Sequence, residues 1–219
     1  MSKSGKDDAA SVAYSVGERA SKPSGAGQRR PRPRLVLASA SPQRRAILES
    51  LDVSFTVRPT AVREREQGPG PEVALQNALA KAHAASAAGD GADEAVLGVD
   101  TIVELSGVLY GKPADESQAR ATLQALSGAT HTVHSGVALL LPEGPRTALA
   151  STAVSFREID EALMRRSLAS GQWRGRSGAY AIQGIGVVLV RRIEGDYHNV
   201  VGLPVATLID LWPQLLDQR

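Results

Sequence analysis

Three short segments of the sequence carry side chains that could act on a phosphorylated ligand. The first follows the apolar run 34–38, where Ser41 and Pro42 suit the cap and first turn of a helix. A capping box would place Glu or Gln three residues after the cap, but Arg44 stands there, with Arg45 beside it. Cations in a first turn oppose the helix dipole by about 0.3–1 kcal/mol each. The segment therefore indicates either an anion site for a phosphate chain or two solvated arginines on a surface helix.

The second segment places Asp100 inside the apolar stretch 95–105 and Lys112 in the following turn Gly-Lys-Pro. A carboxylate within an apolar strand costs free energy unless it is paired or bound to a metal. Asp100 is thus a candidate to bind Mg²⁺ or to orient a water, or else it caps a turn at the end of the strand. Lys112 is either a point charge for phosphate or a solvated turn residue. The spacing is wrong for a Walker A loop, and a proline follows the lysine.

The third segment is the glycine-rich stretch 177–186, in which Gln183 offers both a donor and an acceptor. Closely spaced glycines let the backbone approach a ligand. The order of the glycines is not that of a dinucleotide-binding fingerprint. Taken alone, the stretch is better explained by a bend that leads into a strand.

The elements that must position these segments alternate between strands and helices along the chain. This alternation predicts an α/β protein with a mixed sheet. Expected helices cover 42–51, 72–88, 115–126, 159–170 and 203–216, the last interrupted at Pro213. Expected strands cover 34–38, 53–57, 95–105, 130–141, 146–159 and 186–195, with a hairpin partner in the stretch 108–113.

The charge balance separates an N-terminal tail from the rest of the chain. The 219 residues carry 25 Lys and Arg against 23 Asp and Glu, and the sequence pI is near 9.1. Residues 1–34 alone hold eight cations and three acids, so the remainder is mildly acidic. Residues 1–33 are poor in large apolar side chains and are predicted to be disordered. The basic pI is therefore weak evidence for a nucleic-acid-binding fold.

Composition excludes several other classes. The sequence has no cysteine, which rules out disulfides and thiolate catalysis. No apolar run reaches the roughly 20 residues of a membrane helix, and the N-terminus lacks the apolar core of a secretory signal. We therefore expect a cytoplasmic protein with neither a membrane nor a nucleic acid as its partner.

Five segments, in this order from Leu35 to Val205, resemble the Maf family of nucleoside triphosphate pyrophosphatases. They are LASASPQRRAIL, GVDTIVELSGVLYGKP, LSGATHTVHSG, SGAYAIQGIG and EGDYHNVVGLPV. The resemblance implies a domain over 34–219 with a fold like that of inosine triphosphate pyrophosphatase: an elongated mixed sheet, flanking helices and a cleft between two lobes. It also implies hydrolysis of a nucleoside triphosphate to the monophosphate and pyrophosphate, a divalent cofactor (Mg²⁺ or Mn²⁺), and a possible homodimer.

The resemblance assigns roles to individual residues. Asp100 matches the family's general base or metal ligand, and Glu64 matches an acidic position that helps to hold the metal. The other matched positions contact the substrate in the family: its phosphates at Ser39, Arg44, Lys81 and Lys112, and its nucleobase at Thr101 and Gln183.

Two departures from the family pattern bear on the substrate. Thr101 and Gln183 are typical of members that prefer dTTP and UTP, but Gln43 stands where those members have Arg. Arg176 and Ser177 replace the usual Lys-Ala before Gly-Ala-Tyr. The sequence favours a dTTP/UTP pyrophosphatase. A modified nucleotide such as 7-methyl-GTP is the alternative substrate, and a nucleotide- or nucleic-acid-binding regulator of cell division that uses the basic tail is the alternative function.

Overall fold

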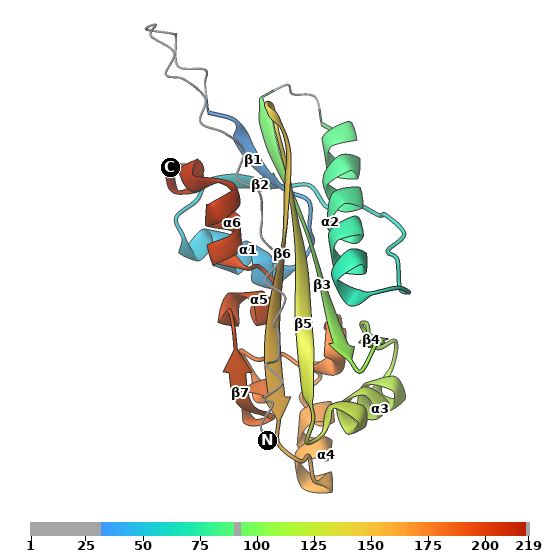
Figure 1. Ribbon diagram of the computed structural model, residues 1–219. Helices are drawn as coiled ribbons and strands as arrows, with labels where there is room; N and C mark the ends of the chain where they lie inside the picture. The colour runs from blue at the N-terminus through green and yellow to red at the C-terminus, as the bar shows by residue number, and fades with distance from the viewer. Residues whose placement is uncertain (1–31, 90–92, 218–219) are drawn as a thin grey trace, which may run out of the picture. The chain divides into compact units, whose positions relative to one another are not determined.

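A computed structural model describes residues 32–89 and 93–217 (Figure 1). The predicted α/β class is confirmed, because helices flank a mixed sheet on both faces. The expected disordered segment 1–33 lies almost wholly outside the described residues.

The sheet has seven strands within the described residues, in the order β2-β1-β3-β5-β6-β7, with β4 paired to β3. Its central strands β3, β5 and β6 have 12, 12 and 13 residues and so extend over about 40 Å. The strands are β1 (Arg34–Leu37), β2 (Phe55–Val57), β3 (Glu94–Leu105), β4 (Val108–Tyr110), β5 (Thr130–Leu141), β6 (Gly144–Phe156) and β7 (Val190–Glu194).

One edge of β3 is only partly covered by neighbouring strands. Strand β1 runs parallel beside residues 94–97, and β4 runs antiparallel beside residues 103–105. The opposite edge of β3 pairs with β5 from Val96 to Glu104. Among the described strands, none pairs with residues 98–102 on the first edge. Asp100 lies in the middle of this gap.

The helices divide between the two faces and the two ends of the sheet (Figure 1). α2 covers one face, whereas α1 and α6 cover the other face near β1. The helices are α1 (Pro42–Ser50), α2 (Gly70–Ala87), α3 (Glu116–Leu126), α4 (Glu161–Ala169), α5 (Tyr197–Val201) and α6 (Val205–Leu211), with 3₁₀ turns η1 (Ser177–Ala179), η2 (Ile185–Val188) and η3 (Pro213–Asp217).

Helix α2 lies unusually close to the sheet because small residues face each other there. A side chain at Gly98 would meet the Ala78 carbonyl oxygen at 2.2 Å, and one at Gly136 would meet the Ala74 carbonyl oxygen at 2.4 Å. These two glycines therefore let the helix backbone rest directly on β3 and β5. The close contact brings short polar side chains of α2 within reach of Asp100.

The core is divided between the two ends of the sheet. One apolar cluster joins α1, α6 and η3 to β1, β3 and β5, and a smaller one joins α2 to the same strands. A second large cluster joins α3 and α4 to the other ends of the strands and to residues 173–189. The two ends are the two lobes that the resemblance implies, with the gap in β3 between them.

Several element boundaries differ from the expectation. The apolar run 186–189 was expected to open a strand, but it lies mostly in η2, and β7 begins at Val190. After β7, Asp196 caps helix α5 by accepting a hydrogen bond from the His198 N–H. α6 ends before Pro213, as predicted. Within the described residues, no helix is both long and apolar enough to cross a membrane.

Candidate functional site

The gap in the edge of β3 opens into a cavity of about 430 Å³. Consecutive strand residues point to opposite faces of a sheet, so Asp100 faces α2 while Thr101 faces α1 and α5. The loop 38–43 after β1, the turn at Lys112 and the segment 175–183 complete the wall. The cavity is therefore formed by segments from both lobes.

The eight residues matched to the family's site all line this cavity. They are Ser39, Arg44, Glu64, Lys81, Asp100, Thr101, Lys112 and Gln183. Arg176 is also part of the lining, so the charged groups of the described lining are four cations and two carboxylates. The excess of positive charge suits an anionic ligand with several charges.

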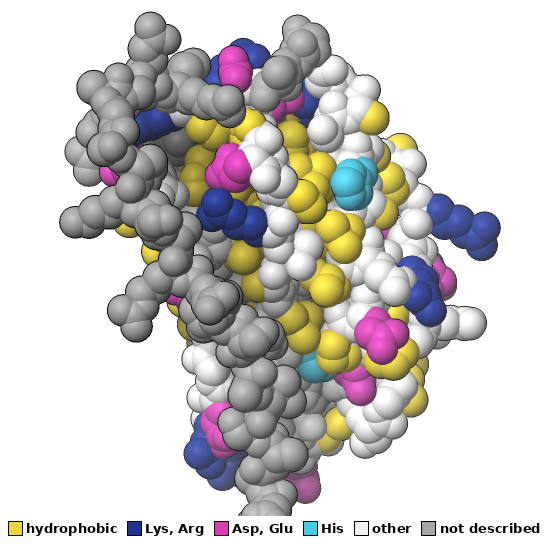
Figure 2. All heavy atoms as spheres, turned by 45° about the horizontal axis from the view of Figure 1, so that its top comes forward, with side chains coloured by type: hydrophobic (Ala, Val, Ile, Leu, Met, Phe, Trp, Pro, Cys, Tyr) yellow, Lys and Arg dark blue, Asp and Glu magenta, His cyan; other side chains and the backbone are white. Residues whose placement is uncertain are grey.

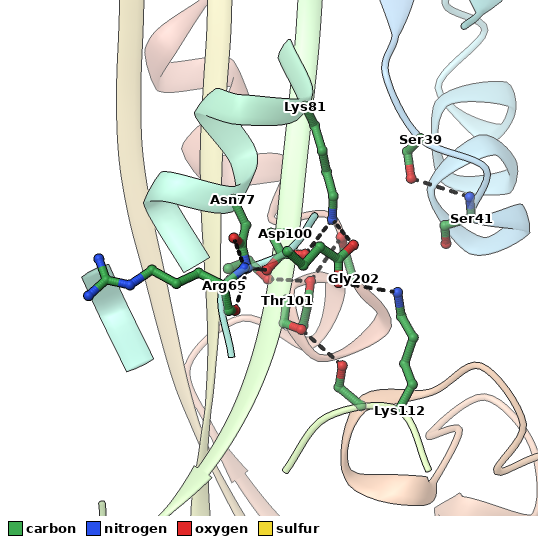
Figure 3. Close-up of polar contacts among 12 residues, drawn as sticks. Ser39, Ser41, Arg65, Asn77, Lys81, Asp100, Thr101, Lys112 and Gly202 are labelled. Carbon is green, nitrogen blue, oxygen red and sulfur yellow. Dashed lines mark hydrogen bonds and ion pairs between the residues drawn. The ribbon is translucent and has the colours of Figure 1, made fainter. Parts of the chain in front are cut away.

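Lys81 joins the two carboxylates (Figure 3). Its ammonium nitrogen lies 2.5 Å from Asp100 Oδ1 and 2.7 Å from Glu64 Oε1. The neighbours of Lys81 in the sequence carry no charge, and both carboxylates come from distant parts of the chain. Burial alone would raise the pKa of Glu64, but the hydrogen bond and charge of Lys81, with the charge of Lys112 at 3.7 Å, hold this pKa below its ordinary value.

Arg44 is buried within the cavity wall rather than solvated. Its Nε donates to the Gly202 carbonyl at 2.8 Å, Nη1 to Ser39 Oγ at 2.9 Å and Nη2 to Thr101 Oγ1 at 3.1 Å. Burial lowers the pKa of Arg44, and the charges of Asp100 and Glu64 partly oppose this shift. Two N–H groups of the guanidinium stay free of these bonds. The adjacent Arg45 is the solvated arginine, since it is exposed and pairs with Glu49 along α1.

The segment 175–183 is tied to the strand that carries Asp100. Ser177 Oγ donates to the Thr101 carbonyl at 3.0 Å, and the Gly178 N–H donates to the Gly111 carbonyl at 3.3 Å. Gly178 has a positive φ of 73°, which few other residues adopt without strain. Gln183 is exposed at the rim of the cavity. Arg176 is half-buried, and burial lowers its pKa.

Asn77 is a buried polar residue next to this site that sequence reasoning missed. Its amide nitrogen donates to Asp100 Oδ2 at 2.9 Å. The signal was present in the sequence, because Asn77 and Lys81 are four residues apart on an otherwise alanine-rich helix. That spacing puts both on one face of α2.

The donor set fits a divalent cation that also binds phosphate. Mg²⁺ is commonly held by one or two carboxylates together with phosphate oxygens of a substrate. Glu64 and Asp100 present such a pair, since one ammonium contacts both. Within the described residues, no group of three or more acidic or histidine side chains is placed to hold a metal without a substrate.

Comparisons with known proteins agree over nearly all of the described chain. The family model described as Maf-like protein matches residues 34–215. A dTTP/UTP pyrophosphatase from Moorella thermoacetica is 44% identical over 180 residues, which cover 81% of this chain and 93% of the relative. Another protein of that name, from Pelotomaculum thermopropionicum, is 40% identical over 179 residues, 81% of this chain and 94% of the relative.

Similarity to solved structures is more distant. A HAM1 protein from Coxiella burnetii is 17% identical, with a TM-score of 0.42 over 71% of this chain and 91% of that one. This likeness is too weak to add to the match with the family model.

Proposed function

This chain belongs to the Maf family, and we propose that it hydrolyses a nucleoside triphosphate, with dTTP and UTP preferred, to the monophosphate and pyrophosphate. The observation that carries the proposal is the cavity at the gap in β3, where four cations surround a pair of carboxylates. Relatives about 40% identical over four fifths of the chain are named dTTP/UTP pyrophosphatases. We assign the activity to residues 34–219.

The cations of the cavity bind the triphosphate. Lys112 is more than half exposed, and Arg176 lines the same wall, so both reach a ligand without first breaking a buried ion pair. The free N–H groups of Arg44 in α1 and the hydroxyl of Ser39 in the loop after β1 add hydrogen bonds. In phosphoryl transfer, catalysis comes almost entirely from positioning and electrostatic stabilisation. A site built mostly from cations suits this chemistry.

Asp100 is the base in the proposed reaction. It accepts a proton from a water as the water oxygen attacks the α-phosphorus, and the bond from that phosphorus to the bridging oxygen breaks. Lys81 and Lys112 stabilise the negative charge that develops on the departing pyrophosphate. A Mg²⁺ or Mn²⁺ ion held by Glu64 and Asp100 would neutralise phosphate charge and lower the pKa of a bound water.

Gln183 and Thr101 select the nucleobase in this proposal. The Gln183 amide offers one donor and one acceptor side by side, which match the O4 and N3–H groups that uracil and thymine share. Thr101 Oγ1 is held by Arg44 and lies 2.9 Å from Ser135 Oγ, so its position in the wall is fixed. Gln43, next to the phosphate loop, is the departure that leaves 7-methyl-GTP as the alternative substrate.

A panel of nucleotides tests the proposal. Pyrophosphate release is measured with Mg²⁺ and with Mn²⁺ for UTP, dTTP, CTP, ATP, GTP and 7-methyl-GTP. We expect the highest kcat/KM for UTP and dTTP. Highest activity on 7-methyl-GTP would overturn the pyrimidine preference, and no pyrophosphate from any nucleotide would overturn the function.

A chain that starts at Arg34 separates the enzyme from the alternative regulator. The proposed enzyme keeps its activity without the basic tail. A regulator that binds nucleic acid through the tail would lose its binding with this deletion, and its affinity would fall steeply with salt. On the part of the face in Figure 2 that is not drawn in grey, Lys and Arg side chains lie among acidic and apolar ones.

We further propose that the protein acts in the cytoplasm as a homodimer. The absence of cysteine suits a reducing compartment, and the proposed substrates are cytoplasmic metabolites. The dimer is implied by the family. Sedimentation equilibrium tests it, and a monomer at micromolar concentration would contradict it.

A further inference from the structure

We propose that Asn77 is a positioning residue that fixes the Asp100 carboxylate and the loop carrying Glu64 in one geometry; this inference rests on the proposed function of the site. Asn77 is 3% exposed and lies on α2, outside the lining of the cavity. Its side chain forms three hydrogen bonds that together use both amide N–H groups and the carbonyl oxygen.

The first contact is with the proposed base. Asn77 Nδ2 donates to Asp100 Oδ2 at 2.9 Å, while Lys81 Nζ donates to Asp100 Oδ1 at 2.5 Å. Both donors come from one face of α2, four residues apart, and each holds a different oxygen of the carboxylate (Figure 3). Two donors on one rigid helix fix the plane of the carboxylate. Each oxygen retains lone pairs for a water or a cation.

The second contact is with the loop between β2 and α2. Asn77 Oδ1 accepts from the Arg65 N–H at 2.7 Å, and Nδ2 donates to the Arg65 carbonyl at 3.0 Å. The Asn77 amide therefore satisfies both the N–H and the carbonyl of Arg65, as the backbone of a neighbouring strand would. Residue 65 lies in a stretch that forms neither helix nor strand, so its backbone lacks such a neighbour. Arg65 directly follows Glu64, so this pairing holds the backbone that carries the second carboxylate.

Through these two contacts, the Asn77 side chain positions both Asp100 and Glu64. Asp100 comes from β3 and Glu64 from an extended loop, and Asn77 bonds to the first directly and to the peptide next to the second. Without the amide, Lys81 alone would relate the two carboxylates, through a flexible four-carbon stem. Loss of Asn77 should therefore disturb the reaction geometry more than the binding of phosphates by Lys112 and Arg176.

Kinetics of Asn77→Ala and Asn77→Leu test this inference. The leucine is close to the original side chain in size, carries no charge and removes both donors and the acceptor, so it provides a second variant should the alanine fail to fold. For both variants we expect kcat for UTP to fall by about 10- to 100-fold, the usual cost of losing a group that orients a catalytic ligand. KM should change by less than about threefold, because the phosphate-binding cations are untouched.

Ser127→Ala is the matched control. Ser127 Oγ also accepts a loop N–H, that of Ile159 at 2.7 Å, but it lies outside the lining of the cavity. The control should lower the midpoint of urea unfolding and leave kcat unchanged. A wild-type kcat in folded Asn77→Leu, or a rise in KM with kcat unchanged, would overturn the positioning role.

A stability measurement, which does not depend on catalytic activity, separates this inference from the proposed function. A double-mutant cycle combines Asn77→Ala with Asp100→Ala and measures unfolding in urea. We expect the two changes to be non-additive by about fivefold or more in the unfolding equilibrium, since the side chains are in direct contact. If wild type releases no pyrophosphate from any nucleotide, the proposed function fails, and the cycle alone decides whether Asn77 holds Asp100. Additive effects in the cycle would refute the inference in either case.

Discussion

Replacing Arg44 by lysine keeps the positive charge at the cavity but removes the planar guanidinium group, which bonds to three parts of the chain. The guanidinium bonds to Ser39 at the end of β1, to Thr101 in β3 and to the Gly202 carbonyl after α5. A lysine ammonium is a point charge on a flexible stem and cannot bond to three acceptors in this planar arrangement. Arg44→Lys therefore tests whether this residue organises the wall or merely supplies charge.

The expected loss of stability follows from the number of bonds. A hydrogen bond from a charged group is worth about 1.5–3 kcal/mol, and lysine retains one of the three. Loss of two bonds gives about 3–6 kcal/mol, a large part of the roughly 5–15 kcal/mol that stabilises an ordinary domain. Because Thr101 and Ser39 would lose their anchor, the KM for UTP should rise as well.

Urea unfolding of wild type, Arg44→Lys and Arg45→Lys gives the measurement. Arg45 is the matched control, since it lies next in sequence and its guanidinium forms an exposed ion pair with Glu49 at 2.7 Å. Exposed pairs of this kind contribute about 0–1 kcal/mol, so Arg45→Lys should be near neutral. If Arg44→Lys unfolds within about 1 kcal/mol of wild type at an unchanged m value, the three-bond explanation is wrong.

Three further predictions follow from other parts of the structure. Gly98→Ala forces α2 away from β3, so it should cost about 2 kcal/mol or more in urea unfolding and abolish UTP hydrolysis. Gly111→Ala is the control and should unfold like wild type, because a Cβ added there meets no atom of the described residues within 4 Å. Burial lowers the pKa of His131 from 6.5 to about 4, so the unfolded chain binds more protons between these values and stability falls as pH falls through them, by up to about 3 kcal/mol. In urea unfolding at pH 7.5 and 4.5, His131→Gln should lose less stability than wild type, and equal losses would contradict this origin. Arg176→Ala should raise the KM for UTP about tenfold through loss of one charge-assisted phosphate contact, and an unchanged KM in steady-state kinetics would exclude that contact.

The sequence identified Asp100 and Arg44 because each breaks a local rule. A carboxylate within an apolar strand and a cation in a first helical turn both need a tertiary explanation. Arg45 breaks the same rule but lies in solvent. The local pattern could not separate the two arginines, because one turn of helix does not reveal which side faces the sheet. The resemblance, rather than the local pattern, distinguished the two arginines.

Local sequence patterns could not predict the contacts between segments that are distant in the chain. The neighbours of Lys81 in sequence are uncharged, yet Glu64 and Asp100 reach it from a loop and from β3. Asn77 escaped notice because the alanine-rich periodicity around it is fully explained by packing on the sheet. The run 186–189 has the composition of a strand, but Gly186 packs against the Ala181 carbonyl, and the chain turns there instead.

The most direct test of the central claim is hydrolysis of UTP in water labelled with heavy oxygen, followed by mass spectrometry of both products. Attack by water on the α-phosphorus places one labelled oxygen in UMP and none in pyrophosphate. Asp100→Asn, folded as judged by its urea transition, should give almost no product. Label in pyrophosphate, release of UDP and orthophosphate, or full turnover by Asp100→Asn would contradict the account.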